Sequence, residues 1–457
     1  MLSTAAIILA ASLPLPSTPA DAVRAALADA KQLPIEARPY TRYLSLYAVP
    51  QSERTDYLRW FTFWAWSLSR EAEPGKPRRV TRDLVAIDLR DYGWDPFVYG
   101  RLAAVDPYFH VSTTIDGKTA KDAGLYAPWL PPAETAQLAL LLGPSPGVTC
   151  QTAILRLDWW VYWTSIQDQR GGAGYYDFLG ITDRASFESL IGLDPKLAAQ
   201  RKAEHRAIVE HSGVSHFPRQ VLRLVSTDGG AWRTLDVLDD ARGARNPIRR
   251  LDRDYQHQAE EHYGIGPSGL FVFLLCDQDG KLQDAAPDKI GPDKTRLGHN
   301  RTRIEVGASC VRCHLEGLRP VSNWMRDVIQ SPTTANVDAE RARRLRVYFR
   351  DLESKLKADN AAYATRLKEC NGLTPAQNAK LFARLWDRYE APLTLADCAR
   401  ELGATLAVFE RALLEVKSAG KLDPAFAGLV ARVPRPIRRE QWEEAFPLAM
   451  QYMGGKP

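Results

Sequence analysis

The stretch of sequence with the most specific chemistry is the pentapeptide CVRCH, which runs from Cys310 to His314. Two cysteines three positions apart lie on the same side of a helical turn, so their sulfur atoms can form thioethers with the two vinyl groups of one haem. The histidine that follows lies on the same side and can bind the haem iron through a ring nitrogen. The motif therefore predicts one covalent haem c, attached to Cys310 and Cys313, with His314 as an axial iron ligand.

Two other kinds of site use a C-x-x-C pair. A structural zinc site needs further ligands close by, usually a second cysteine pair, and the sequence has none near Cys310. A redox dithiol of the thioredoxin type needs a βαβ context, which the surrounding pattern does not indicate. Haem c is therefore favoured, with zinc and a dithiol or disulfide as the alternatives.

The second axial ligand of the iron is less directly indicated. Met325 is the only methionine between His314 and Met450. It follows the motif by eleven residues on an expected helix, too near the proximal side to fold back over the iron. We therefore expect Met325 to be a core residue rather than a ligand; Met450 and Met453 are distant in sequence but remain possible ligands.

Among the seven other histidines, His257 is the strongest candidate for the haem site. The segment that contains it leads into an apolar strand ending at Cys276, and a hairpin after that strand returns the chain toward Cys310. We therefore predict His257 as an axial or distal haem group, and Glu261 as the carboxylate that orients it or takes part in proton transfer. The alternative is an ordinary histidine of the surface or the core.

The remaining arginines and cysteines near the motif suggest supporting roles. Arginines could donate to haem propionates, although solvated surface charge is the more common role: they are Arg301, Arg303, Arg312 and Arg319. In an exported chain Cys370 could pair with Cys398, and Cys150 with Cys276, but neither pairing follows from the sequence.

Local patterns predict an α+β fold: a mixed α/β N-terminal part with a short antiparallel sheet, a haem-binding segment, and an all-α C-terminal domain. Strands are expected over 80–90 and 269–276, with a hairpin turn at 277–281, and 153–164 is compatible with either a strand or a helix. Helices are expected over 22–31, 52–68 (buried nearly all round), 134–142, 196–211, 339–357, 361–368, 375–389, 394–402, 406–418 and 439–450, with Thr374, Thr394 and Thr405 as N-caps.

The first residues resemble a secretory signal peptide. A short apolar run precedes the A-x-A-like site Ala20-Asp21-Ala22, although no Lys or Arg precedes the run. We therefore expect export to the periplasm, with a buried first helix or an uncleaved anchor as the alternatives. The expected division is a signal peptide over 1–22, an α+β domain over 23–300, a c-type haem-binding segment over 301–335 and a helical domain over 336–457, with a polar linker at 330–336.

Composition excludes several classes of protein. The 457 residues carry a net charge of only +5, which does not indicate a nucleic-acid binder. No segment approaches 18 uninterrupted apolar residues, so we expect no integral membrane span in the mature chain. The sequence lacks a phosphate-binding glycine loop, a G-x-S-x-G and an H-E-x-x-H motif, so nucleotide hydrolysis and zinc proteolysis have no support.

Seven short motifs together resemble a large, poorly characterised family of exported bacterial proteins with a single C-x-x-C-H, a cytochrome c-like group. In chain order they are Leu84–Trp94 (LVAIDLRDYGW), Arg156–Trp159 (RLDW), Tyr176–Gly180 (YDFLG), Ser212–Ser215 (SGVS), His257-x-x-x-Glu261 with Pro267-x-Gly269-Leu270, Ser309–His314 (SCVRCH) and Tyr389–Leu393 (YEAPL). The resemblance runs from about Arg38 to the C-terminus and implies a covalent haem and an envelope location, but no particular reaction. His257 and Glu261 match the family pattern, whereas His216 stands where the family has polar amides and is a weak further candidate.

Three functions are compatible with these expectations. The favoured one is an exported monohaem protein that transfers or senses electrons in the cell envelope, together with a redox partner protein. The second is a haem enzyme, dependent on peroxide or oxygen, with an open distal site and His257 or Glu261 as the base. The third is a non-catalytic envelope binding protein whose haem is structural.

Overall fold

A computed structural model describes residues 18–109, 129–142, 153–167, 172–193, 196, 205–209, 215, 217–227, 229–238, 245–250, 256–287, 303–321, 340 and 345–454. The predicted linker at 330–336, the candidates His216 and Met325, and Arg301 and Cys150 lie outside these residues. Of the predicted signal peptide, 1–17 lies outside them, while Thr18 caps helix α1 (Pro19–Ala30) in a capping box with Asp21.

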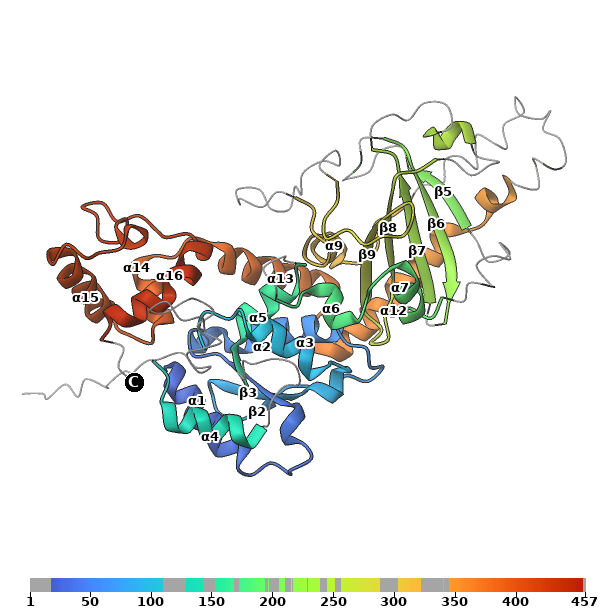
Figure 1. Cartoon of the computed structure of the whole chain (residues 1–457). Helices are drawn as coiled ribbons and strands as arrows, with labels where there is room; N and C mark the ends of the chain where they lie inside the picture. Colours follow the sequence, from blue (N-terminus) through green and yellow to red (C-terminus); the bar gives the residue numbers. More distant parts are fainter. Residues whose placement is uncertain are drawn as a thin grey trace, which may run out of the picture.

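The first sheet has four strands in the order β2-β3-β1-β4. The central strand β1 (Thr41–Ser45) pairs antiparallel with β3 (Leu84–Asp88) and parallel with β4 (Ile154–Arg156), and β2 (Arg78–Arg79) adds an edge. Figure 1 shows α1 and α4 (Pro132–Leu142) on one side of this sheet, and α2 (Arg54–Ser67) and α5 (Leu157–Thr164) on the other.

One prediction in this region is confirmed, and one open alternative is decided. Helix α2 is buried on nearly all its faces, because its aromatic residues contact α5 on one side and the C-terminal helix α13 (Pro375–Glu390) on another. The segment 153–164, compatible with either structure, forms both: strand β4 and then helix α5.

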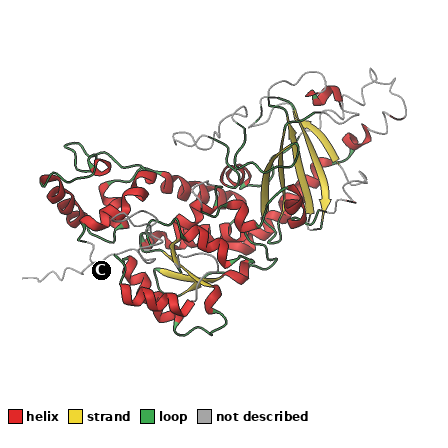
Figure 2. Cartoon of the chain, in the orientation of Figure 1, coloured by secondary structure: helices red, strands yellow, loops and turns green. Residues whose placement is uncertain are grey.

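The second sheet is a five-stranded antiparallel meander in the order β5-β6-β7-β8-β9 (Figure 2). Its strands are β5 (His205–Val209), β6 (Arg219–Ser226), β7 (Gly229–Asp236), β8 (Ala259–Ile265) and β9 (Phe271–Asp277). The predicted strand and turn around 269–281 are confirmed as β9 and its hairpin, with Gly280 at φ 84°.

The helix predicted over 196–211 is wrong at its C-terminal end, where the chain forms β5. Residues 205–209 pair along their whole length with β6, from His205 opposite Arg223 to Val209 opposite Arg219. These hydrogen bonds come from a strand whose paired residues lie 10 to 18 positions later in the chain, and they override the local helical pattern.

The C-terminal part is helical, as predicted. The three threonines predicted as N-caps each accept a hydrogen bond from the backbone of the first helical turn. One helix replaces parts of two predicted ones, because α12 runs without a break from Leu352 to Asn371. The other helices here, besides α13, are α14 (Leu395–Glu401), α15 (Leu406–Ser418) and α16 (Arg439–Tyr452).

The C-terminal helices share a core with the N-terminal part. Phe382 of α13 packs edge-on against Trp60 of α2, with ring centroids 6.0 Å apart. Asp359 of α12 accepts hydrogen bonds from Arg223 and Trp232 of the second sheet, each at 2.9 Å. The protein is thus α+β, with two sheets connected by helices from both ends of the chain. No helix among the described residues is long and apolar enough to cross a membrane.

Candidate functional site

The CVRCH motif forms the helix α9 (Ala308–His314), which lies beside β9 and the end of α13 (Figure 1). Gly307 precedes it at φ 79°, a left-handed conformation that favours glycine. A Cβ atom at Gly307 would lie 2.6 Å from the carbonyl oxygen of Ser165 and 2.7 Å from the ring of Tyr175. The Ser165 oxygen also accepts a hydrogen bond from the Ala308 amide at 2.6 Å. The start of α9 is therefore docked directly on the end of α5.

The imidazole of His314 packs on an aromatic pair of the second sheet. Tyr263 and Phe273 are directly opposite each other on β8 and β9, and their ring centroids lie 5.5 and 5.6 Å from that of His314. Nδ1 of His314 is buried and has no hydrogen-bond partner among the described residues. Burial lowers the pKa of His314, while the negative charge of Glu261 opposes this shift. Burial thus favours the neutral form of the imidazole, which is the form that binds metals.

Two tyrosines of α6 (Tyr175–Leu179) fix the position of β9, the strand that carries Phe273. β9 is the last strand of its sheet, and such an edge leaves backbone amides that need partners. The Phe273 amide donates to the Tyr175 hydroxyl at 2.9 Å, and the Leu275 amide donates to the Tyr176 hydroxyl at 3.0 Å. The position of Phe273 is thus determined by a tyrosine about a hundred residues earlier in the chain.

The two cysteines of the motif differ in exposure. Cys310 is 3% exposed and lies near Tyr175 and Tyr176, whereas Cys313 is half-buried. After the motif, the chain is anchored to α12 through Asn360. The Asn360 side chain accepts a hydrogen bond from the Leu318 amide at 2.7 Å and donates one to the Leu318 carbonyl at 2.9 Å. The structure therefore brings Cys310, Cys313 and His314 together in one short helix that is fixed at both ends.

The arginines predicted near the motif have separate surroundings. The guanidinium of Arg312 lies 5.7 Å from the ring centroid of Trp386 and forms an ion pair of 3.2 Å with Asp387, both on α13. Arg303 donates a long hydrogen bond of 3.5 Å to the carbonyl of Ala286. Arg319 is exposed.

The structure pairs His257 and Glu261 with different partners from the predicted ones. His257 Nε2 lies 2.7 Å from a carboxylate oxygen of Glu260, and Glu261 accepts from Arg219 at 3.1 Å. The expectation that Glu261 orients His257 is therefore corrected to Glu260. The physical reason is the strand: consecutive residues of β8 point to opposite faces, so Glu261 shares the face of Tyr263 and His314 while Glu260 points away.

A second group of reactive side chains lies on that other face and was not predicted. Glu260 and His262 of β8 and Cys276 of β9 are all buried and adjacent. Burial lowers the pKa of His262 to about 4 and raises the pKa of the Cys276 thiol to about 12. The sequence holds a weak signal for this group, since Glu260 and His262 are two apart in a strand, but only the register of β9 brings Cys276 opposite Glu260.

A third polar group joins two of the family-like motifs. Arg156 and Asp158, from RLDW, form a buried ion pair of 2.6 Å, and Arg156 also contacts Glu401 of α14. Arg439 of α16 donates to Glu401 at 2.6 Å and to the carbonyl of Tyr389, the first residue of the YEAPL motif. These residues line a cavity of about 180 Å³. With its charges already paired inside the protein, this group is best explained as a fixed link between the C-terminal helices and the first sheet.

Glu443 of α16 gives this region a testable pH dependence. Burial raises the pKa of Glu443 to about 7, and its carboxyl group is bonded to the Tyr389 hydroxyl at 2.6 Å. From about pH 4.5 to 7 the unfolded chain is ionised at this group while the folded chain is not, so the wild type loses about 1.4 kcal/mol of stability per pH unit, ~3 kcal/mol in all. We expect Glu443→Gln to gain that much stability relative to the wild type over this window and to level off above pH 7.

Urea unfolding of both proteins at several pH values measures this difference. The matched control is Glu444→Gln, because Glu444 is the next residue and is exposed. A Glu443→Gln difference that stays flat from pH 4.5 to 7, like that of the control, would contradict the raised pKa.

Comparison with known proteins does not extend these observations: no protein-family model, no curated protein and no solved structure matches the chain.

Proposed function

We propose that this chain is an exported protein that carries one covalent haem c and transfers or senses electrons in the cell envelope. The observation that carries the proposal is the arrangement of Cys310, Cys313 and His314 in a single helix, with the His314 ring packed on Tyr263 and Phe273. A haem c bound there would supply an iron that cycles between its ferrous and ferric forms.

The residues present fit such a group. Two thiols at i and i+3 and an imidazole at i+4 lie on neighbouring positions of one helix face, as thioether attachment and axial ligation require. The buried Nδ1 of His314 has no hydrogen-bond partner in the described part of the chain, and an unpartnered buried nitrogen is costly unless something binds or fills the site.

Each neighbouring residue has a role in this proposal. Cys310 and Cys313 would hold the group, and His314 would bind its iron. Tyr263 and Phe273 keep the imidazole in one orientation and exclude water from that side of it. Glu261 is held by an ion pair with Arg219, and its negative charge acts to raise the pKa of His314.

Export is part of the same proposal, because haem c is attached outside the cytoplasm. Helix α1 needs Thr18 and Asp21 for its capping box, so cleavage before Thr18 would leave the helix intact, whereas cleavage after Ala22 would remove its first turn. N-terminal sequencing of the protein recovered from a periplasmic extract tests both the location and the cleavage position.

The function is tested with protein co-expressed with cytochrome c maturation enzymes. We expect a c-type pyridine haemochrome spectrum equivalent to one haem per chain, and a low-spin visible spectrum that cyanide and carbon monoxide leave unchanged, because an electron carrier has both axial positions filled by protein. A high-spin spectrum that shifts with cyanide would overturn electron transfer in favour of a haem enzyme with an open site. A chain without covalent haem would overturn the whole proposal.

A further inference from the structure

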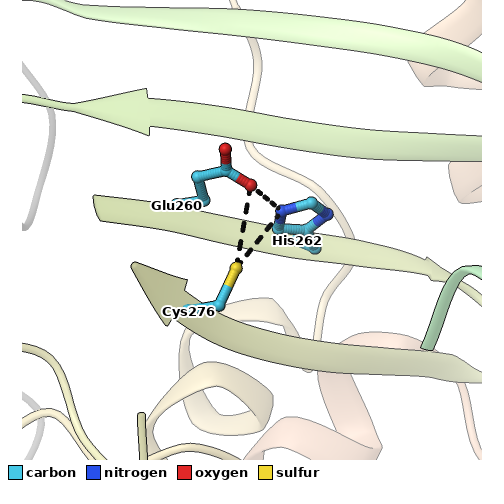
Figure 3. A group of neighbouring side chains, drawn as sticks. All are labelled: Glu260, His262 and Cys276. Carbon is cyan, nitrogen blue, oxygen red and sulfur yellow. Dashed lines mark hydrogen bonds and ion pairs between the residues drawn. The ribbon is translucent and has the colours of Figure 1, made fainter. Parts of the chain in front are cut away.

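The buried group on the far face of the second sheet consists of Glu260, His262 and Cys276 (Figure 3). None of the three side chains points toward α9, because they alternate along the strands with Glu261, Tyr263 and Phe273, which face the motif helix. All three are at most 4% exposed. The group is therefore separate from the proposed haem site and is not explained by it.

The three reactive atoms converge on one point. Nε2 of His262 lies 2.6 Å from an oxygen of Glu260, and Sγ of Cys276 lies 3.7 Å from each of these two atoms. A catalytic relay of thiol, imidazole and carboxylate uses both ring nitrogens, one for the thiol and the other for the carboxylate. Here a single nitrogen faces both groups, an arrangement that suits ligands around a common cation.

The surroundings orient Glu260 as those of a metal ligand do. The carboxylate oxygen that does not face His262 is contacted by His257 Nε2 at 2.7 Å, and Arg184 of α7 (Arg184–Leu190) donates to both oxygens at 3.1 and 3.2 Å. Bound carboxylates in metal sites are commonly held by such outer hydrogen bonds. The other nearby cation, Arg233, is paired with Glu188 at 2.7 Å, so its charge is offset.

We propose that Glu260, His262 and Cys276 bind one zinc ion, with water or a small ligand in the fourth position. Carboxylate oxygen, imidazole nitrogen and thiolate sulfur are the donors that zinc takes in proteins, and three protein ligands with one open position form a non-structural zinc site.

The proton balance of binding follows from the contacts. Zn²⁺ replaces the proton of the Cys276 thiol, which passes to the solvent, and binds the neutral imidazole of His262 at Nε2 while the single imidazole proton is held on Nδ1. The sulfur contacts of 3.7 Å already match the spacing of neighbouring ligands in a tetrahedral zinc site, roughly 3.5 Å. Only the oxygen and nitrogen of the acid–imidazole pair must separate.

The test is the metal content of the full-length, haem-loaded protein, measured by plasma mass spectrometry after dialysis against metal-free buffer. We expect about one zinc per chain in the wild type, and less than about a tenth of that in Cys276→Ser and His262→Gln. The matched control is Cys398→Ser: Cys398 is also a buried thiol, on α14 and outside the cluster, and its replacement should leave zinc unchanged.

Two further measurements keep the result interpretable. Haem content is measured on the same samples, so a failure of the haem proposal and a failure of the zinc proposal are seen separately, and far-ultraviolet circular dichroism identifies any variant that has not folded. His257→Asn changes a ring that is 21% exposed and contacts the Glu260 carboxylate at 2.7 Å, so it should fold and weaken zinc binding tenfold or more. A wild type that holds no zinc and takes up none at micromolar Zn²⁺, or a folded Cys276→Ser with wild-type zinc content, would overturn the proposal.

Discussion

Replacing Cys310 and Cys313 together by alanine is expected to abolish covalent haem completely, while the protein still folds. The two sulfur atoms are the only attachment points that the motif offers, so without them no thioether can form. Each change removes only one sulfur atom, from the half-buried Cys313 and from Cys310 beside Tyr175. The cost of the double change in folding stability should therefore be small, about 1–3 kcal/mol. Haem staining of a denaturing gel and the pyridine haemochrome spectrum measure the loss.

A matched control separates this effect from a general loss of thiols. Cys370 of α12 is also buried and lies outside the motif, so Cys370→Ala should retain one haem per chain. His314→Ala should give an intermediate result, with haem attached but its iron spectrum changed. Covalent haem that persists in the double variant would show that attachment occurs elsewhere, and the role assigned to the motif would be wrong.

Replacing Glu401 by glutamine is expected to lower the free energy of unfolding by about 3–5 kcal/mol. Glu401 is 3% exposed, and its carboxylate accepts from Arg156 at 3.0 Å, from Arg439 at 2.6 Å and from the indole of Trp442 at 2.7 Å. The neutral side chain keeps the shape but leaves two buried guanidinium groups without their shared carboxylate, which is the costly way to break a buried ion pair. The pKa of Glu401 is lowered because these two arginines outweigh its burial, so it is ionised in the folded protein.

Urea unfolding at neutral pH measures this change, with Glu410→Gln as the control. Glu410 lies on the next helix, α15, and is exposed, so its replacement should change stability by no more than about 0.5 kcal/mol. If Glu401→Gln costs less than about 1 kcal/mol, the network is not what attaches α14 and α16 to the first sheet. The same attachment explains why the helical part has a shared core with the N-terminal part rather than an independent one.

The disulfide between Cys370 and Cys398 that the sequence left open is not formed. Cys370 and Cys398, which could have been paired, are separate buried thiols on α12 and α14. Burial raises the pKa of both thiols, which makes them unreactive core residues at neutral pH. In this region the helices are held together instead by the buried hydrogen bonds and ion pairs of Glu401 and by aromatic packing.

Features formed by residues close together in the chain could be predicted well from the sequence. The N-caps at Thr374, Thr394 and Thr405, the buried helix α2 and the strand and turn around 269–281 depend on hydrogen bonds or burial patterns within a few residues. The same is true of the turn that gathers Cys310, Cys313 and His314. Its spacing is an intrinsic property of one helical turn and needs no knowledge of the rest of the fold.

Contacts between distant segments were decided by the tertiary structure alone. The register of β8 against β9 sets Tyr263 beside Phe273 under His314, and the same register sets Glu260 opposite Cys276 on the other face. A shift of one residue would exchange these two sets, since strand residues alternate between faces. That alternation is why Glu260, and not Glu261, is the partner of His257. Which of two adjacent carboxylates meets a histidine, and which thiol completes a cluster, depends on pairing between strands, which no local pattern in the sequence encodes.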